Sequence, residues 1–265
     1  MGVATLSWHE IGAYAIAAAI YLGVLMGLRR SAETVGRWVL AIGLALHLVD
    51  IGMRCVHGVN PISSTPEAMS LVAFLIAAGY LGATLRYRLP AAGAFAVPGA
   101  LVVLVLARLA PAEAATPNMG SLGRVHVLLA TFGVAVFAMA AVLATLYLLE
   151  DRQLKHNHLQ RVMGVGTPLD TLDRLALRCV SIGFPLFTIA IVTGAIWIAR
   201  LGLLRTAGAL RPEYLFAVVT WMAFGVLLLA RVGAGWRGRR AAWLTLGGFG
   251  GAMLVLLTYF FRHAA

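Results

Sequence analysis

Long apolar runs and short polar segments alternate along this chain from one end to the other. A helix that crosses a lipid bilayer needs about 20 consecutive, mostly apolar residues. Eight runs are of this kind, at residues 9–28, 36–56, 68–86, 92–110, 122–149, 178–200, 213–231 and 240–261. The pattern predicts an all-α integral membrane protein, a bundle of about eight transmembrane helices in a single domain over residues 1–265.

The composition excludes a soluble protein. Apolar residues make up 61% of the chain, charged residues make up 12%, and the mean hydropathy is +0.90. A soluble domain of this length could not bury so much apolar surface in one core, whereas a bilayer solvates it. The first run has neither a basic region before it nor a small-residue cleavage site after it, so we expect a retained span rather than a signal peptide.

The net charge of +11 predicts an orientation and not a nucleic-acid partner, because the basic residues lie at the ends of the apolar runs. One side of the predicted bundle collects fourteen of them, namely Arg29, Arg30, Arg37, Arg86, Arg88, Arg152, Lys155, Arg161, Arg174, Arg178, Arg231, Arg237, Arg239 and Arg240. The other side collects seven, namely Arg54, Arg108, Arg124, Arg200, Arg205, Arg211 and Arg262. Since basic residues accumulate in cytoplasmic loops, we expect a multi-pass protein of the bacterial plasma (inner) membrane with both termini on the outer, periplasmic side.

Prolines mark the expected connections between spans. Pro90 and Pro212 are expected in loops, as breakers between apolar runs. The longest loop, 150–177, is expected to be cytoplasmic and to contain a short amphipathic helix around 169–177.

A polar stripe rises along the second apolar run. His47, Asp50, Arg54 and His57 are spaced by three, four and three residues, which places them on one face of a helix. Such a face avoids lipid, so it must contact protein or a cavity. Two interpretations stay open: an Asp50–Arg54 salt bridge that orders the bundle, or His47 as a ligand or proton carrier.

His126 lies at the mouth of the 122–149 run, with Arg124 just before it. Neutral imidazole is the usual protein ligand of haem iron, and a flat, largely apolar haem suits the outer edge of a membrane. Its propionates would pair with arginines, for which Arg124 and Arg54 are candidates. No G-x-S-x-G, H-E-x-x-H or phosphate-loop spacing is present, so we expect a binding or assembly factor rather than a stand-alone catalyst.

Three parts of the chain resemble the CcsA-type cytochrome c assembly proteins. The amino-terminal likeness consists of Ala45-Leu46-His47, Arg54, Gly58, Pro61 and Glu67. The middle likeness consists of Gly123-Arg124-Val125-His126-Val127 and, after an apolar span, Leu-Tyr-Leu-Leu-Glu and Leu154-Lys155. The carboxy-terminal likeness consists of Gly194-Ala195-Ile196-Trp197-Ile198-Ala199, Arg211-Pro212-Glu213, Trp221 and Gly235-Trp236-Arg237-Gly238.

The resemblance implies that the protein holds or passes haem at the outer face of the membrane, for attachment to apocytochrome c. Members of this family ligate b-type, non-covalent haem through two intramembrane and two outer histidines. By position, His126 resembles the first outer axial ligand of the iron and His47 the first intramembrane one, and His263 is the candidate for the second outer histidine. The implied partners are the lipid bilayer, haem, other cytochrome c assembly proteins and apocytochrome c.

Two departures favour the HemX-like and YpjD-like branch of the same family. Arg231 stands where the second intramembrane histidine is expected, and the 200–212 loop lacks the tryptophan-rich signature. The alternatives are a regulatory or scaffolding protein of the same fold without haem, and a small-solute or ion transporter that uses the stripe from His47 to Arg54.

Overall fold

Eight long helices make up the part of the chain that the structure describes. The computed structural model describes residues 2–27, 31–87, 89–110, 120–155, 167–200 and 211–264, with side chains between Trp8 and Thr258 except for that of Pro90. The helices are α1 (Gly2–Leu25), α2 (Ser31–Val56), α3 (Thr65–Arg86), α4 (Pro90–Leu109), α5 (Ser121–Lys155), α7 (Leu169–Arg200), α8 (Pro212–Gly233) and α9 (Arg239–Ala264). Each is long and apolar enough to cross a membrane, which confirms the predicted class of fold.

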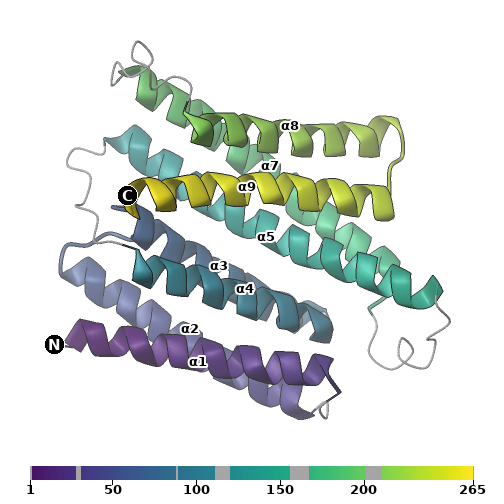
Figure 1. Cartoon of the computed structure of the whole chain (residues 1–265), viewed down its shortest axis with the longest axis horizontal. Helices are drawn as coiled ribbons and strands as arrows, with labels where there is room; N and C mark the ends of the chain where they lie inside the picture. The colour runs from purple at the N-terminus through teal and green to yellow at the C-terminus, as the bar shows by residue number, and fades with distance from the viewer. Residues whose placement is uncertain are drawn as a thin grey trace.

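Successive helices run in opposite directions, and the described chain begins and ends at the same edge of the bundle (Figure 1). This edge also holds the amino-terminal end of α5, where His126 lies, and we call it the His126 end. The opposite end holds the carboxy-terminal end of α5 and the turn between α8 and α9 (Figure 1).

Two of the expected loop prolines begin helices instead. Pro90 and Pro212 are the first residues of α4 and α8. Proline is tolerated in the first turn because the first backbone N–H groups of a helix have no partner within the helix. Helix α3 is capped at its start by Ser64, whose Oγ accepts a 3.4 Å hydrogen bond from the backbone N–H of Glu67.

Helices α5 and α7 are longer than the apolar runs that predicted them. The first continues from the predicted end at 149 to Lys155, and the second begins at Leu169 instead of 178. The short helix expected around 169–177 is therefore the first part of α7 and not a separate element. Residues 156–166 of the predicted loop lie outside the described residues.

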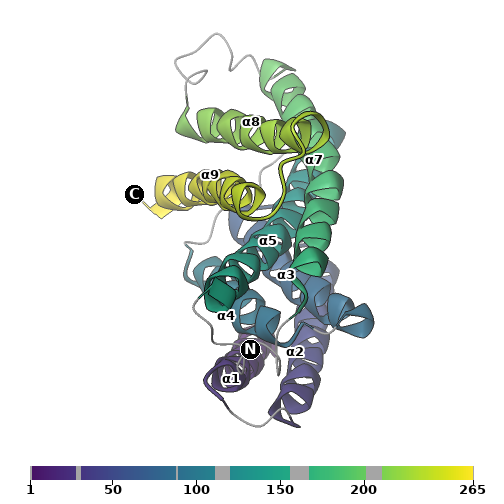
Figure 2. The same ribbon diagram turned by 90° about the vertical axis from the view of Figure 1, so that its right-hand side faces the viewer.

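The buried side chains form two apolar clusters that meet at α5. The larger cluster joins α1 to α4 with α5 and includes Tyr14, Tyr80 and Leu104. The smaller one joins α5 to α7, α8 and α9, around Phe137 and Phe224, whose rings stack at 3.8 Å. Figure 2 shows the result: α8 and α9 lie on the other side of α5 from α1 and α2.

Candidate functional site

The imidazole of His126 is held by the backbone of a neighbouring helix. His126 lies in the second turn of α5, and its Nδ1 donates a 2.6 Å hydrogen bond to the carbonyl oxygen of Ala190 on α7. In a neutral imidazole the other nitrogen, Nε2, then carries the lone pair. Nε2 makes no hydrogen bond to any residue that the structure describes. This is the arrangement in which proteins present a histidine to a metal, with the distal ring nitrogen fixed by a carbonyl.

The ring of His126 occupies space that a glycine of α7 provides. A Cβ atom at Gly194 would lie 2.7 Å from both Cε1 and Nδ1 of His126, closer than any ordinary contact. The indole ring of Trp197, one turn further along α7, lies 6.3 Å from the imidazole between ring centres. Gly194 and the Ala190 carbonyl therefore fix the position of the imidazole between them, and Trp197 flanks it.

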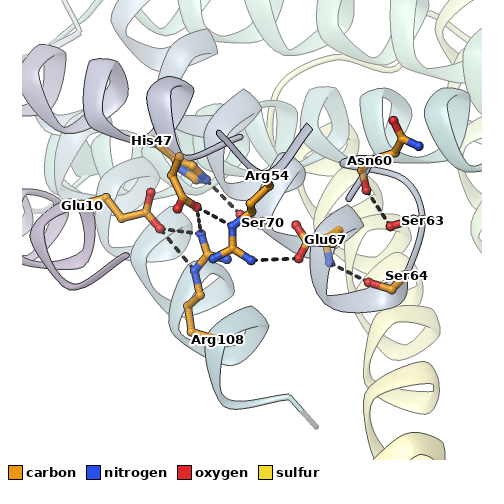
Figure 3. Close-up of polar contacts among 10 residues, drawn as sticks. Glu10, His47, Arg54, Asn60, Ser63, Ser64, Glu67, Ser70 and Arg108 are labelled. Carbon is orange, nitrogen blue, oxygen red and sulfur yellow. Dashed lines mark hydrogen bonds and ion pairs between the residues drawn. The ribbon is translucent and has the colours of Figure 1, made fainter. Parts of the chain in front are cut away.

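A second polar cluster joins α1, α2, α3 and α4 near the His126 end (Figure 3). Arg108 of α4 donates to Glu10 of α1 at 2.6 Å and to Asp50 of α2 at 2.7 Å. Arg54 donates to Asp50 at 2.8 Å and to Glu67 of α3 at 3.0 Å. We call these five residues the carboxylate–arginine network. Because it takes one or two members from each helix, it fixes how the four helices are placed at this end.

The network is buried at its centre and contains more carboxylates than guanidinium groups. Its three carboxylates face two guanidinium groups, and the side chains of Glu10 and Asp50 are fully buried. One oxygen on each, Oε2 of Glu10 and Oδ1 of Asp50, has no hydrogen-bond partner among the described residues. These two buried carboxylates share the guanidinium of Arg108, and for Glu10 it is the one described ion-pair partner.

His47 lies next to this network and is fully buried. Its Nε2 is 2.9 Å from the hydroxyl of Ser70, and its Nδ1 is 3.2 Å from the hydroxyl of Tyr14. The rings of Tyr14 and Phe74 meet the imidazole edge-on. Both ring nitrogens therefore have protein partners, and His47 does not fit an axial haem ligand in this arrangement.

The structure divides the candidate residues between two places. The Asp50–Arg54 salt bridge of the first interpretation is present, and His47 is close to it. His57 is exposed, and its Nδ1 hydrogen-bonds the carbonyl of Met53 instead. The described partners of His126 lie on α7, whereas those of His47 lie on α1 and α3, so the two histidines share no described contact.

The candidate partners of haem propionates also differ from each other. The donors of Arg54 are directed at Asp50 and Glu67, whereas Arg124 is exposed on the first turn of α5. His263 lies in the last turn of α9, and its side chain is outside what the structure describes.

Arg231 has a structural partner at the opposite end of the bundle. Its Nη1 and Nη2 each donate a 2.7 Å hydrogen bond to one carboxylate oxygen of Asp173 on α7. The same carboxylate accepts from the backbone N–H of Gly238 at 3.0 Å, in the turn before α9. The bidentate pair of Arg231 and Asp173 therefore links α8 to α7, and Asp173 links both to the turn before α9.

Replacing Arg231 by methionine is expected to lower the free energy of unfolding by about 2–3 kcal/mol, because Asp173 keeps only one donor in a nearly buried place. The midpoint of thermal unfolding in detergent measures this loss. Arg174→Met is the matched control, since Arg174 pairs with Asp170 on the exposed surface of α7, the helix that carries Asp173. Equal midpoints for the two variants would contradict the structural role of Arg231.

Some members of these clusters were missed in the sequence. Glu10 and Arg108 fall within predicted spans, where a charged residue needs a partner, so their positions in the sequence could have indicated an ion pair. Ser70, Tyr14 and the carbonyl of Ala190 gave no signal, because a hydroxyl or carbonyl partner depends on which helices are neighbours.

Comparison with known proteins agrees with this architecture. The chain matches the sequence profile of the family described as cytochrome C assembly protein over residues 38–264. It is similar to the cytochrome c biogenesis protein CcsA of Synechococcus elongatus, with 41% identity over 81 residues, which are 31% of this chain and 24% of that protein. A similar match to the cytochrome c biogenesis protein CcsA of Synechocystis has 39% identity over 83 residues, again 31% of this chain and 24% of the relative.

These matches thus span about a quarter of the curated relatives, whereas the family profile covers far more than half of this chain. The eight apolar helices and the extent of the profile match lead to one conclusion: the chain belongs to the cytochrome c assembly protein family.

Proposed function

We propose that this protein binds haem through His126 and holds or passes it during cytochrome c maturation. Membership of the family supports a role in that process. The observation that carries the haem-binding part is the imidazole of His126, whose Nδ1 is fixed by the Ala190 carbonyl and whose Nε2 has no hydrogen bond to a described residue. The iron of a haem bound there would take this nitrogen as an axial ligand.

The surroundings of His126 are suited to a flat ligand with acidic groups. Trp197 offers an aromatic face beside the imidazole, and Arg124 offers an exposed guanidinium in the first turn of the same helix, two residues before His126. Both lie near the His126 end, where a ligand can be exchanged with a second protein at the membrane surface. His263 remains the candidate for a second axial ligand.

We place the His126 end on the outer side of the bacterial inner membrane. This rests on the sequence-based assignment of arginine and lysine to the two sides, with seven expected on the side of the His126 end and fourteen on the other. Haem, other assembly proteins and apocytochrome c are then the partners that the His126 end would meet. The chain binds and positions haem, and a partner carries out the covalent attachment.

A scaffolding role without haem is the second candidate. It is favoured by the two hydrogen bonds that occupy His47 and by the ion pair that occupies Arg231, because both positions serve the helix bundle instead of a ligand.

The visible spectrum of the detergent-purified protein decides between the two. We expect a Soret band and a sharp α band in the reduced form, with about one haem per chain in a pyridine haemochrome assay. Protein that carries no haem after expression with added haem precursor would contradict the proposal and favour the scaffold.

The glycine beside His126 provides an independent prediction. Gly194→Val is expected to lower haem affinity about 10- to 100-fold, because groups that orient a metal-ligating histidine contribute that much. Haem titration of the apoprotein measures the change. Gly247→Val is the control, since a Cβ there meets nothing within 4 Å. Unchanged affinity in Gly194→Val would show that the position of the ring does not matter for binding.

A further inference from the structure

A groove of about 510 Å³ lies between α5 and α9 at the end of the bundle opposite to His126. Its apolar part is formed by Leu148 and Leu149 of α5 and by Leu246 of α9. Trp243, which is 58% exposed, lies among them. An exposed tryptophan at a helix end is typical of the boundary between lipid tails and headgroups.

The rim of this groove is basic. Arg152 and Lys155 come from the last turns of α5, and Arg239 comes from the first turn of α9. The one acidic residue of the lining, Asp151, is paired with Lys155 at 2.9 Å. Neither Arg152 nor Arg239 has an acidic partner among the described residues. The groove therefore carries positive charge that no acidic residue in the described part of the chain neutralises.

The start of α9 increases this positive charge. Helices usually place acidic residues in the first turn, where the macrodipole and the unpaired N–H groups are positive. The first turn of α9 contains no acidic residue and begins with Arg239 and Arg240. Like charges at this positive helix end are unfavourable, and an anion lying against them would offset that.

We propose that this groove binds an anionic phospholipid of the surrounding leaflet. The phosphate lies between Arg152 and Arg239, and an acyl chain lies along Leu148, Leu149 and Leu246. A phospholipid matches both parts of the groove at the depth where they occur, because it joins an anionic headgroup to an apolar chain. Basic pockets between membrane helices select anionic lipids in this way. A small soluble anion would use only the rim, and a zwitterionic lipid would offset the charge less.

Fluorescence quenching in lipid nanodiscs tests the proposal. The protein is placed in phosphatidylcholine with increasing mole fractions of phosphatidylglycerol brominated on its acyl chains, which quenches nearby tryptophan. The difference between each protein and its Trp243→Phe counterpart isolates the signal of the groove. We expect half-maximal quenching of Trp243 at a mole fraction about 25-fold lower in the wild type than in the Arg152→Gln/Arg239→Gln double variant, since each basic side chain contributes about fivefold.

Matched arms distinguish the proposal from its alternatives. Arg86→Gln/Arg174→Gln removes two arginines from the same end but outside the groove, and it should behave as the wild type does. The same curve with brominated phosphatidylcholine, or equal curves in wild type and Arg152→Gln/Arg239→Gln, would overturn the proposal. Displacement of the brominated lipid by inorganic phosphate would reveal a small-anion site, and displacement by haem a haem site; either would also overturn it. None of these readouts depends on haem at His126, so this proposal and the proposed function can fail separately.

Discussion

Replacing His126 by glycine is expected to abolish the haem absorbance of the purified protein, whereas His47→Ala is expected to retain most of it. The difference follows from the partners of the two rings. The Ala190 carbonyl holds one nitrogen of His126 and leaves the other for a ligand, while hydroxyl groups of Ser70 and Tyr14 occupy both nitrogens of His47. Haem content per chain, from the pyridine haemochrome assay, measures the effect of each variant.

Two controls separate loss of the ligand from loss of the fold. His57→Ala removes a histidine near the His126 end whose Nδ1 also bonds a backbone carbonyl, that of Met53, and it should leave haem content unchanged. Added imidazole should restore the spectrum of His126→Gly, since it can occupy the space left by the side chain. Equal haem content in wild type and His126→Gly would remove His126 from the site. Loss of haem in His47→Ala, in a protein with an unchanged unfolding midpoint, would return His47 to it.

Replacing Arg108 by methionine is expected to destabilise the protein by about 3–5 kcal/mol, the range found when one partner of a buried ion pair is removed. Arg108 is the only described partner of Glu10 and one of two for Asp50, and both carboxylates are fully buried. Without it, Glu10 is left unpaired within the membrane-spanning part of the bundle. Unfolding by sodium dodecyl sulfate, followed by circular dichroism, measures the loss.

A second substitution checks that the cause is the unpaired carboxylate. Glu10→Gln in the Arg108→Met background should recover part of the stability, because it removes the uncompensated negative group. Arg174→Met, which breaks an exposed pair with Asp170, should cost less than about 1 kcal/mol. If Arg108→Met is no more destabilising than Arg174→Met, the carboxylate–arginine network does not hold α1 to α4 together.

The pattern of apolar runs predicted all eight spans because a bilayer requires each helix to satisfy its own backbone and to present apolar side chains. It could not predict the helix ends, since a polar extension such as the last turn of α5 carries no apolar signal. Pro90 and Pro212 were placed in loops for a related reason. Proline stops a helix that precedes it and also starts one that follows it, and the pattern does not say which.

Spacing along one helix gave the Asp50–Arg54 salt bridge as one of two interpretations, because positions four residues apart are neighbours on any helix surface. Ion-pair partners that come from other helices cannot be predicted in this way. That Arg108 reaches both Glu10 and Asp50, or that Asp173 accepts both guanidinium nitrogens of Arg231, depends on which helices pack together and in which register.

The sequence by itself thus determined the class of fold, the number of spans and the resemblance to the cytochrome c assembly proteins, since these depend on local hydrophobicity and on residues close in the chain. Only the tertiary structure decided the different situations of the two histidines. Whether an imidazole nitrogen is left for a ligand depends on groups brought by other helices: the Ala190 carbonyl beside His126, and the hydroxyls of Tyr14 and Ser70 beside His47. Those groups are 64, 33 and 23 residues away from their histidines, and helix packing brings them within hydrogen-bonding distance.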